Sequence, residues 1–440
     1  MGSPFCDMLD RQAREQGART AIVSEAERRS VTFTELAQRV GALPLDGVKP
    51  GDFVALATGN GVAFIEHLFA LRARGAAVLT IDAKQSPREV ATRLGARWLV
   101  TRDEGLVRVG DGRALPAGTA FVKLTSGSTV APRGALFTEE ALVGGIEHIR
   151  EGMSLTREDV VLVAIPLSHS YGFDNGPLSL AAIGTPLVIQ MDVLPGAVRA
   201  SIERHGVTFW PAVPALLRAV SGPLAPSLRR VISASAPLSR GTADAFAAAT
   251  GVRVQEFFGA TEAGGIAFET RPDDPASEGT VGFPMPGVRI ELADGCVRVH
   301  SEANRFALLT EAGVETSPPY VETGDRACLT PEGRLKLLGR TVHVANVGGV
   351  KVDLAAIETF FRGVAGVSDA AAMALEDPAR GQRVVVAVES QSRTAEELKA
   401  LINGDLAPHE VPRDIRVLAR LPRTERGKLD RAALEGLIRA

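Results

Sequence analysis

Short apolar segments alternate with amphipathic ones through the first third of the chain, and this alternation constrains the fold most strongly. Val54–Ala57, Ala77–Ile81 and Trp98–Thr101 have the length and composition of buried strands. Between them, Asn60–Arg74 carries apolar residues at three-to-four spacing, and Ser86-Pro87-Arg88-Glu89 has the signals of a helix start capped by its serine. The order strand–helix–strand–helix–strand predicts a parallel sheet with helices on its faces.

The pattern of predicted strands, helices and turns changes at two later points in the sequence. From Gly279 to Leu338, short strands separated by Gly, Pro and Asp turns predict a small β-rich subdomain. After Arg340, a helix at Leu354–Arg362, two apolar strands and a helix beginning at Thr394 predict a compact unit of about 100 residues. We therefore expect an α/β fold in two domains. Residues 1–340 would form a large N-terminal domain of layered, mostly parallel sheets with helices, and residues 341–440 a small mobile α+β domain.

Charge and cysteine content exclude several classes of function. The 440 residues carry 49 Lys and Arg against 52 Asp and Glu, a net charge of −3, so neither nucleic acid nor a membrane surface is the expected partner. The three scattered cysteines fit a reducing compartment rather than a disulfide framework. The N-terminus becomes charged before an apolar run can form, and we expect no membrane span and a cytoplasmic location.

A loop of small, mostly hydroxylated residues follows the apolar segment Ala120–Leu124. It reads Thr125-Ser126-Gly127-Ser128-Thr129, with Arg133 four residues later. The N–H and O–H groups of such a loop can wrap a polyphosphate, and an arginine adds a fixed positive charge. The ending Gly-Lys-Ser/Thr of the P-loop is missing from the sequence. Taken alone, the segment fits a flexible surface loop equally well.

Four further short motifs follow in order. Phe258-Gly259-Ala260-Thr261-Glu262 ends a strand, Thr323-Gly324-Asp325 and Gly339-Arg340 lie in the β-rich part, and Leu421–Arg431 contains an Arg-Gly-Lys sequence. In this order and spacing, and together with the hydroxylated loop, they resemble the adenylate-forming superfamily of acyl-CoA synthetases, peptide-synthetase adenylation domains and luciferases. The resemblance extends over nearly the whole chain.

The resemblance implies that the chain binds ATP and Mg²⁺. The hydroxylated loop with Arg133 would hold the β- and γ-phosphates, Thr261 the α-phosphate and Glu262 the metal, since a hard cation prefers oxygen ligands. Lys428 would bridge the substrate carboxylate and the phosphate, where two anions must approach each other. The residues implied for the nucleoside are Ser235, Ala236, Pro237, Phe258 and Gly259 around the adenine, and Asp325 and Arg340 at the ribose.

The acyl and thiol sites follow from two more family-like segments. His169, in Ile165–Phe173, would border the acyl pocket as a catalytic residue. The implied walls of that pocket are Tyr171, Phe173, Trp210, Phe257, Ala263 and Gly264. Gly348, Gly349 and Lys351 would lie at the thioester half-site, where adjacent glycines let a pantetheine arm pass close to the backbone.

Asp174 follows Phe173 as an amine-binding aspartate follows phenylalanine in peptide synthetases. The spacing from His169 to Gly184 is instead that of the acyl-CoA synthetases, so we expect Asp174 to be a pocket-wall or surface residue.

These features predict a ligase that activates a small-molecule carboxylic acid with ATP·Mg²⁺ and transfers the acyl group to a thiol, with CoA as the first expected acceptor. One alternative is a stand-alone adenylation enzyme that loads the phosphopantetheine of a carrier protein. Another is a catalytically impaired acyl- or nucleotide-binding protein, since Val130, Arg133 and Val342 depart from the family's usual residues. The apolar walls favour an aryl or medium acyl chain over an amino acid. The identity of the acid and the oligomeric state stay open.

Overall fold

The computed structural model describes most of the 440 residues. The described parts are residues 3–125, 132–271, 279–340, 344–347, 350–377, 381–402, 406, 411–424, 427 and 429–439. Residues 340, 344, 346, 350, 351, 353 and 381 are described by their backbone alone.

One large sheet has eight strands in the order β19-β18-β8-β7-β4-β3-β5-β6, six of them from residues 53–137. Its centre is parallel, as predicted, because β3 pairs with β4 and β5, and β4 pairs with β7. The strands are β3 (Phe53–Ala57), β4 (Ala77–Thr80), β5 (Trp98–Thr101), β6 (Gly105–Arg108), β7 (Phe121–Leu124), β8 (Gly134–Phe137), β18 (Ala307–Leu309) and β19 (Val314–Thr316). Helices α3 (Val62–Ala73) and α4 (Pro87–Leu94) connect the central strands.

One local prediction at α4 is wrong. Ser86 stands at the N-cap position, but its φ is +50° and its side chain makes no capping hydrogen bond. The left-handed backbone turns the serine away from the geometry that a cap requires, which is extended.

A nine-stranded sheet in the order β15-β14-β13-β12-β11-β9-β10-β1-β2 lies beside the first. Its strands from β13 to β1 run parallel, and β14, β15 and β2 pair antiparallel at the two sides. The strands are β1 (Thr20–Ser24), β2 (Arg29–Thr32), β9 (Val161–Val163), β10 (Leu187–Ile189), β11 (Phe209–Ala212), β12 (Arg230–Ser233), β13 (Val254–Ala260), β14 (Gly264–Phe268) and β15 (Phe283–Pro284). The associated helices are α1 (Pro4–Gln16), α2 (Phe33–Ala42), α5 (Glu139–Gly152), α6 (Ser170–Phe173), the π-helical turn η1 (Asp174–Leu178), α7 (Ser179–Ala182), α8 (Pro195–His205), α9 (Pro214–Ala219) and α10 (Arg240–Thr250).

The predicted β-rich segment forms a four-stranded antiparallel sheet in the order β16-β17-β20-β21. These strands are β16 (Arg289–Ala293), β17 (Cys296–His300), β20 (Val321–Leu329) and β21 (Leu335–Arg340). The segment does not stay together, however. Strands β18 and β19 leave it and extend the eight-stranded sheet through pairing of β18 with β8.

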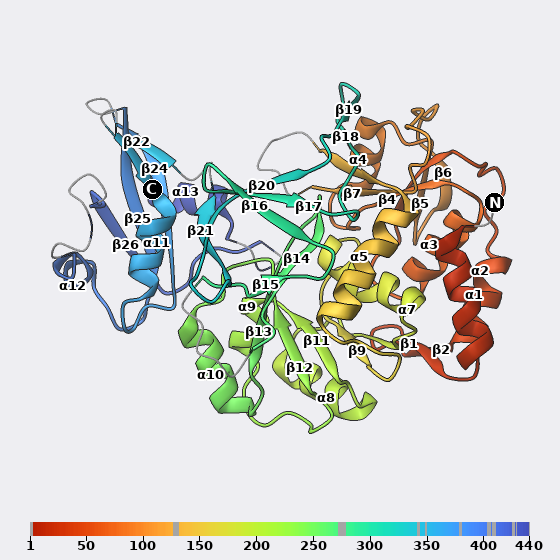
Figure 1. The fold of residues 1–440 in the computed structure, drawn as a ribbon, viewed down its shortest axis with the longest axis horizontal. Coiled ribbons are helices and arrows are strands. Elements are labelled where there is room, and N and C mark those ends of the chain that lie inside the picture. Colours follow the sequence, from red (N-terminus) through yellow and green to blue (C-terminus); the bar gives the residue numbers. More distant parts are fainter. Residues whose placement is uncertain are drawn as a thin grey trace.

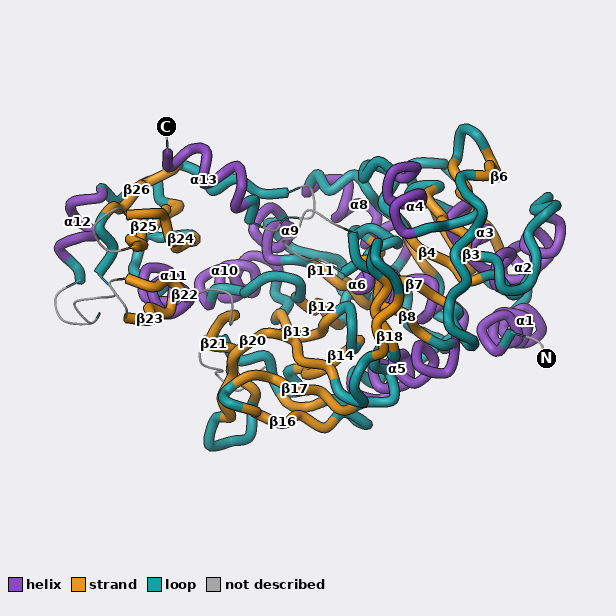
Figure 2. The backbone as a smooth tube through the Cα atoms, turned by 90° about the horizontal axis from the view of Figure 1, so that it is seen from above, coloured by secondary structure: helices purple, strands orange, loops and turns teal. Residues whose placement is uncertain are grey.

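The C-terminal part is an α+β unit at one end of the molecule, with five strands and three helices among its described residues (Figures 1 and 2). It contains β22 (Val344–Val347), β23 (Val350–Asp353), β24 (Asp369–Asp377), β25 (Gly381–Glu389), β26 (Asp414–Leu418), α11 (Leu354–Arg362), α12 (Ala395–Ala400) and α13 (Arg431–Arg439). The helix predicted to begin at Thr394 is confirmed as α12, and Thr394 and Glu397 form a reciprocal capping box at its start.

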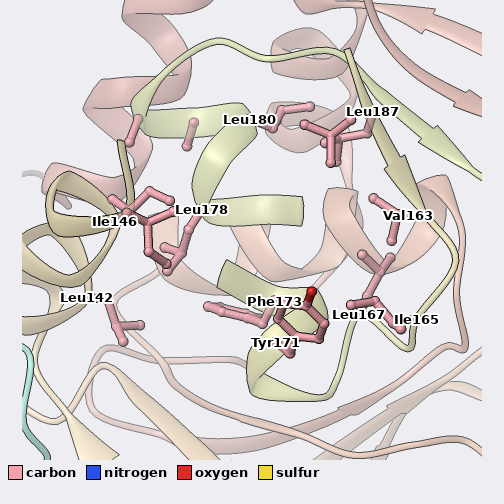
Figure 3. Packing of buried hydrophobic residues seen from close by; sticks show 14 of the residues in the cluster. Leu142, Ile146, Val163, Ile165, Leu167, Tyr171, Phe173, Leu178, Leu180 and Leu187 are labelled. Carbon is pink, nitrogen blue, oxygen red and sulfur yellow. The ribbon is translucent and has the colours of Figure 1, made fainter. Parts of the chain in front are cut away.

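Four clusters of buried apolar residues form the cores. The largest joins residues of both large sheets, including the rings of Tyr171 and Phe173 (Figure 3). The described members of the two clusters in the C-terminal unit all follow residue 344. The α/β class with a large and a small part is thus the observed one, and the domain boundary at 340/341 stays a prediction.

Candidate active site

The two segments predicted to enclose the adenine come together at one edge of the nine-stranded sheet. Strands β11, β12 and β13 are parallel neighbours, so their carboxyl ends lie side by side, where ligands commonly bind in open α/β sheets. Ser235-Ala236-Pro237 follows the end of β12, and Phe258-Gly259 lies at the end of β13. Ser235 has a left-handed backbone with φ of +71°, and the side chains of Ser235 and Pro237 are exposed.

The turn after β13 carries Thr261 and Glu262. Strands β13 and β14 pair antiparallel, with Ala260 opposite Gly264, so the two polar residues sit at the tip of a tight hairpin. The side chains of both are half-buried. Ala263, directly after them, is fully buried, and Gly264 has a φ of +68° that favours glycine.

A single carboxylate at this turn suits one metal in particular. Among the residues that the structure describes, no group of three or more His, Cys, Asp and Glu side chains could hold a metal ion. Glu262 is the carboxylate of this turn, and its role as a metal ligand stays a prediction. Mg²⁺ fits such a site because it takes only one or two carboxylates in nucleotide sites and draws its other ligands from phosphate and water.

The hydroxylated loop connects two strands of the other large sheet. Strands β7 and β8 pair antiparallel up to Leu124 and Gly134, and the Thr125 N–H donates to the Arg133 carbonyl at 2.9 Å. Ser126, Gly127, Ser128, Thr129 and Val130 lie outside the described residues. The exposed Arg133 guanidinium lies 4.0 Å from Glu315 of β19, which is a weak contact at the limit of an ion pair.

Arg305 is a cation at this site that sequence analysis missed. Its backbone N–H donates to the Glu262 carbonyl at 2.8 Å, and its Nη1 donates to Ser317 Oγ at 3.0 Å. Its buried Nε has no hydrogen-bond partner in the described part of the chain. Burial lowers the pKa of Arg305, Glu262 raises it and Arg133 lowers it, so Arg305 is close enough to interact with both. One arginine among 42 gives no signal in the sequence.

The two residues implied for the ribose are neighbours across a strand pair. Asp325 of β20 stands directly opposite Arg340 of β21 in the antiparallel register. The Asp325 N–H donates to Thr323 Oγ1 at 3.1 Å, which fixes the backbone of the Thr-Gly-Asp motif. Directly opposed residues have close Cβ atoms, so the pairing brings both positions to one place.

Tyr171 connects the His169 segment to the edge of the nine-stranded sheet. His169 stands at the N-cap position of α6 and is half-buried. The Tyr171 ring stacks on Phe257 of β13 at 5.8 Å, and its hydroxyl donates to the Ala212 carbonyl at the end of β11 at 3.2 Å. Burial raises the pKa of Tyr171 well above its usual 10.0, although the backbone hydrogen bond acts in the opposite sense. The phenol is therefore neutral and fixed in place, and its role as a pocket wall stays a prediction.

Two other implied wall residues lie in the core instead. The Phe173 side chain is 1% exposed and packs edge-to-face on Phe121 of β7 at 5.5 Å. Trp210 is fully buried, and its ring lies 6.2 Å from Phe246 of α10. Residues so enclosed can support a pocket from behind but do not face an open one.

Asp174 is a buried ion-pair partner, whereas the sequence predicted a pocket wall or the surface. Its Oδ1 accepts a hydrogen bond from Lys123 Nζ at 2.6 Å, and the two side chains are 11% and 3% exposed. Lys123 also lies over the rings of Phe173 and Phe137, at 4.9 and 5.4 Å. The pair joins the strand before the hydroxylated loop to the turn after Tyr171. The lysine within the apolar sequence of β7 was the one sign in the sequence that pointed to a buried ion pair.

The C-terminal motif approaches the same sheet edge. Lys428, Gly348, Gly349 and Val342 lie outside the described residues, and Lys351 is described by its backbone alone. Gly427 is described, and a methyl group at its Cα would lie 3.3 Å from Ala215 Cβ and 3.7 Å from Val213 Cγ2. Val213 directly follows β11, and Ala215 lies in the first turn of α9. Gly427 is therefore seated beside the end of β11.

The fold and this sheet edge define an adenylate-forming enzyme, the class of AMP-forming acid–thiol ligases that use ATP. The chain belongs to the AMP-binding enzyme family, whose model matches residues 9–105 and 111–300, and the model of the AMP-binding enzyme C-terminal domain matches residues 356–428. In the described part of the chain, no helix is long and apolar enough to cross a membrane.

Several curated proteins and solved structures are similar to the chain. It is 31% identical to 2-hydroxy-7-methoxy-5-methyl-1-naphthoate–CoA ligase of Streptomyces carzinostaticus, in a match that covers 73% of this chain and 63% of that ligase. It is 26% identical to feruloyl-CoA synthase of an Amycolatopsis species, over 91% of this chain and 92% of the synthase. The fold matches ATP-bound MatB from Rhodopseudomonas palustris with a TM-score of 0.83 at 20% identity, over 99% of both chains.

Proposed function

We propose that the chain converts an aryl carboxylic acid to its acyl-adenylate with ATP·Mg²⁺ and then transfers the acyl group to CoA. The meeting of Tyr171 with β11 and β13 carries this proposal. Tyr171 stacks on Phe257, and Phe257 stands four residues before Thr261 on the same strand and turn. An acid bound against the two rings would direct its carboxylate toward the turn assigned to the α-phosphate.

The first half-reaction joins two anions. A carboxylate oxygen attacks the α-phosphorus, the bond to the bridging oxygen breaks, and pyrophosphate leaves. Thr261 is assigned to the α-phosphate, Lys428 to the charge between the reacting groups, and Glu262 to Mg²⁺. Bound Mg²⁺ would offset phosphate charge. Placing such charges in advance is the main contribution that a site of this kind makes.

Residues from several strands and the loops that follow them are assigned to substrate orientation. Ser235-Ala236-Pro237 and Phe258-Gly259 are proposed to enclose the adenine, and the Asp325–Arg340 pair to hold the ribose. The Thr125–Thr129 loop is assigned to the β- and γ-phosphates, with Arg133 beside it. Arg305 adds a second guanidinium near Arg133 and Glu262.

The second half-reaction needs a different surface of the C-terminal unit. The thiol sulfur attacks the acyl carbonyl, the bond to phosphate breaks, and AMP leaves. His169 is assigned to the border of the acyl pocket, and Gly348, Gly349 and Lys351 to the thiol arm. We propose that the C-terminal unit rotates about residues 340–343 between the steps, a hinge motion that a few backbone angles can absorb.

Two observations favour an aryl acid. Relatives of the chain are named for naphthoate, salicylate and ferulate, which all carry an aromatic ring, while others are named for malonate and oxalate, which carry none. The side chains that meet at the proposed acyl site, Tyr171 and Phe257, are uncharged and stacked, which suits a flat ring.

An acid-dependent pyrophosphate-release screen tests the proposal. The full chain is given ATP, Mg²⁺ and one acid from aryl, fatty, dicarboxylic and amino-acid sets, with a reaction lacking acid as the control. We expect AMP and pyrophosphate with aryl acids and little release with amino acids. Release of ADP and phosphate, or a response to amino acids alone, would contradict the proposal.

The acceptor is tested by adding CoA or a phosphopantetheinylated carrier protein to the active acid. Thioester formation with CoA is expected. Transfer to the carrier protein alone would identify a stand-alone adenylation enzyme, and no adenylate with any acid would favour an impaired binding protein. We place the enzyme in the cytoplasm, which fits three free cysteines.

A further inference from the structure

Five charged side chains form a continuous chain of ion pairs in the C-terminal unit, which we call the arginine–carboxylate ladder. Arg362 of α11 occupies its centre, donating from Nε to Asp369 Oδ1 at 2.8 Å and from Nη2 to Glu358 Oε2 at 3.0 Å. Arg423 Nη2 donates to the second oxygen of Asp369. Arg431 Nη2 donates to the second oxygen of Glu358 at 3.0 Å. Each carboxylate is thus shared by two arginines.

The inner members of the ladder are largely buried, and each makes more than one hydrogen bond. The Glu358 side chain is 8% exposed, Arg362 17% and Asp369 20%. Backbone groups satisfy further donors and acceptors, since Arg362 also donates to the Ala370 carbonyl at 2.8 Å. Burial would raise the pKa of Asp369, but its two arginines outweigh burial and hold the pKa below its usual 3.8. Such networks add geometric definition rather than much stability, because desolvation offsets most of the attraction.

The two outer arginines are the two ends of the segment 423–431, which contains Gly427 and Lys428. The segment is closed on itself, because Arg423 pairs with Leu429 in an isolated bridge and Arg423 Nη1 donates to the Gly427 carbonyl at 3.1 Å. Its far end is also fixed, since Arg431 Nη1 donates to the Ala372 carbonyl at 3.0 Å. The ladder therefore holds both ends of one loop to α11 and β24.

The loop faces the large part of the molecule. Gly427 is seated against Val213 and Ala215, at the corner between β11 and α9. Burial lowers the pKa of Arg218 on α9, and Arg423 lowers it further while Asp369 raises it, so the ladder's outer end lies close to α9. The ladder thus stands between the body of the C-terminal unit and the corner next to the candidate active site.

We propose that the arginine–carboxylate ladder positions the 423–431 loop for adenylate formation, with Glu358, Arg362 and Asp369 as positioning residues that touch neither ATP nor acid. The inference rests on the role proposed for Lys428. The physical reason is that a charge beside the reacting groups must be placed accurately. A reacting charge displaced by about 1 Å loses on the order of 10²-fold in rate. A loop of nine residues held at both ends has few conformations in which to misplace Lys428.

The test compares the two half-reactions in Asp369→Asn and Arg423→Gln. We expect pyrophosphate release at saturating ATP and acid to fall on the order of 10- to 10²-fold, with the KM for both substrates little changed. Thioester formation from chemically supplied acyl-adenylate and CoA should stay within about 2-fold of the wild type, because the role proposed for Lys428 ends with the first step. The double variant should be no worse than the poorer single variant, since the residues act as one unit.

Two further variants separate positioning from folding. Arg431→Gln removes an outer, 39% exposed member and should give a smaller loss with the same selectivity. Arg439→Gln breaks the exposed Arg439–Glu435 pair on α13 and should change neither step. Equal losses in both half-reactions, or a fully active Asp369→Asn, would overturn the positioning role. A wild-type chain that releases no pyrophosphate with any acid would instead refute the proposed function, and the ladder's role with it.

Discussion

Replacing Lys123 with methionine tests the buried ion pair beneath the candidate active site. Methionine keeps the length and apolar stem of the side chain and removes the charge that faces Asp174. The carboxylate would stay 11% exposed and lose the ammonium that now donates to it at 2.6 Å. The substitution thus isolates the effect of an unpaired buried charge.

The expected loss is large because both members are desolvated. Removing one partner of a buried ion pair typically costs about 3–5 kcal/mol of folding free energy. The two ring contacts of Lys123 add to this, although methionine sulfur also packs well on aromatic rings. In Lys123→Met/Asp174→Leu no unpaired charge remains, and the double variant should return to within about 1 kcal/mol of the wild type. The coupling energy of the cycle should therefore be at least about 3 kcal/mol.

Equilibrium urea unfolding followed by tryptophan fluorescence provides the assay. The chain's two tryptophans, Trp98 and Trp210, lie on β5 and β11, so the signal reports on the two large sheets. A lower midpoint at unchanged slope measures lost stability. Arg88→Met, which breaks the exposed Arg88–Glu104 pair, is the matched control and should lose at most about 1 kcal/mol. A Lys123→Met loss no larger than the control's, or a double variant less stable than both singles, would refute the reasoning.

Four other outcomes are expected. Glu262→Gln should raise the Mg²⁺ concentration needed for pyrophosphate release, and normal turnover at low Mg²⁺ would remove Glu262 as the ligand. Lys428→Ala should slow adenylate formation on the order of 10²–10³-fold while supplied acyl-adenylate still reacts with CoA; parallel losses in both steps would make the lysine structural. The two arginine partners of Asp369 outweigh burial and lower its pKa. The ion pairs of Asp369 therefore stabilise the fold above pH 3.8, and this stabilisation is lost as the pH falls below that value. Asp369→Asn should accordingly flatten the acid dependence of the far-UV circular dichroism signal. Gly282→Ala should destabilise by well over about 1 kcal/mol, since φ is +86° and a methyl group would lie 2.2 Å from neighbouring backbone atoms, whereas Gly241→Ala, with open space around it, should not.

Local signals located many of the elements of the fold from the sequence. The helix predicted at Leu354–Arg362 has the bounds that the structure gives α11, and Trp98–Thr101 is a strand with the predicted bounds. Apolar periodicity and capping residues act within a few positions of each other, so they can be read without knowing what packs from elsewhere. The cap at Ser86 failed because the preceding turn imposed a left-handed backbone there.

Burial of individual side chains was harder to predict. Phe173 and Trp210 were expected to line a pocket, yet they pack on Phe121 and Phe246, which come from other elements. The sequence showed aromatic residues near a motif, but an aromatic ring can pack in a core as well as line a pocket. Which of the two it joins depends on the layer that covers it.

By itself, the sequence determined the alternation of strands and helices, the order of the motifs and the class of chemistry they indicate. Only the tertiary structure decided which motifs share a sheet edge, and which charges are buried together. Lys123 and Asp174 are 51 residues apart, and Asp369 and Arg423 are 54 apart. The physical reason is that burial and charge pairing arise between segments distant in the chain, once strand order has been fixed, whereas periodicity and capping are properties of neighbours.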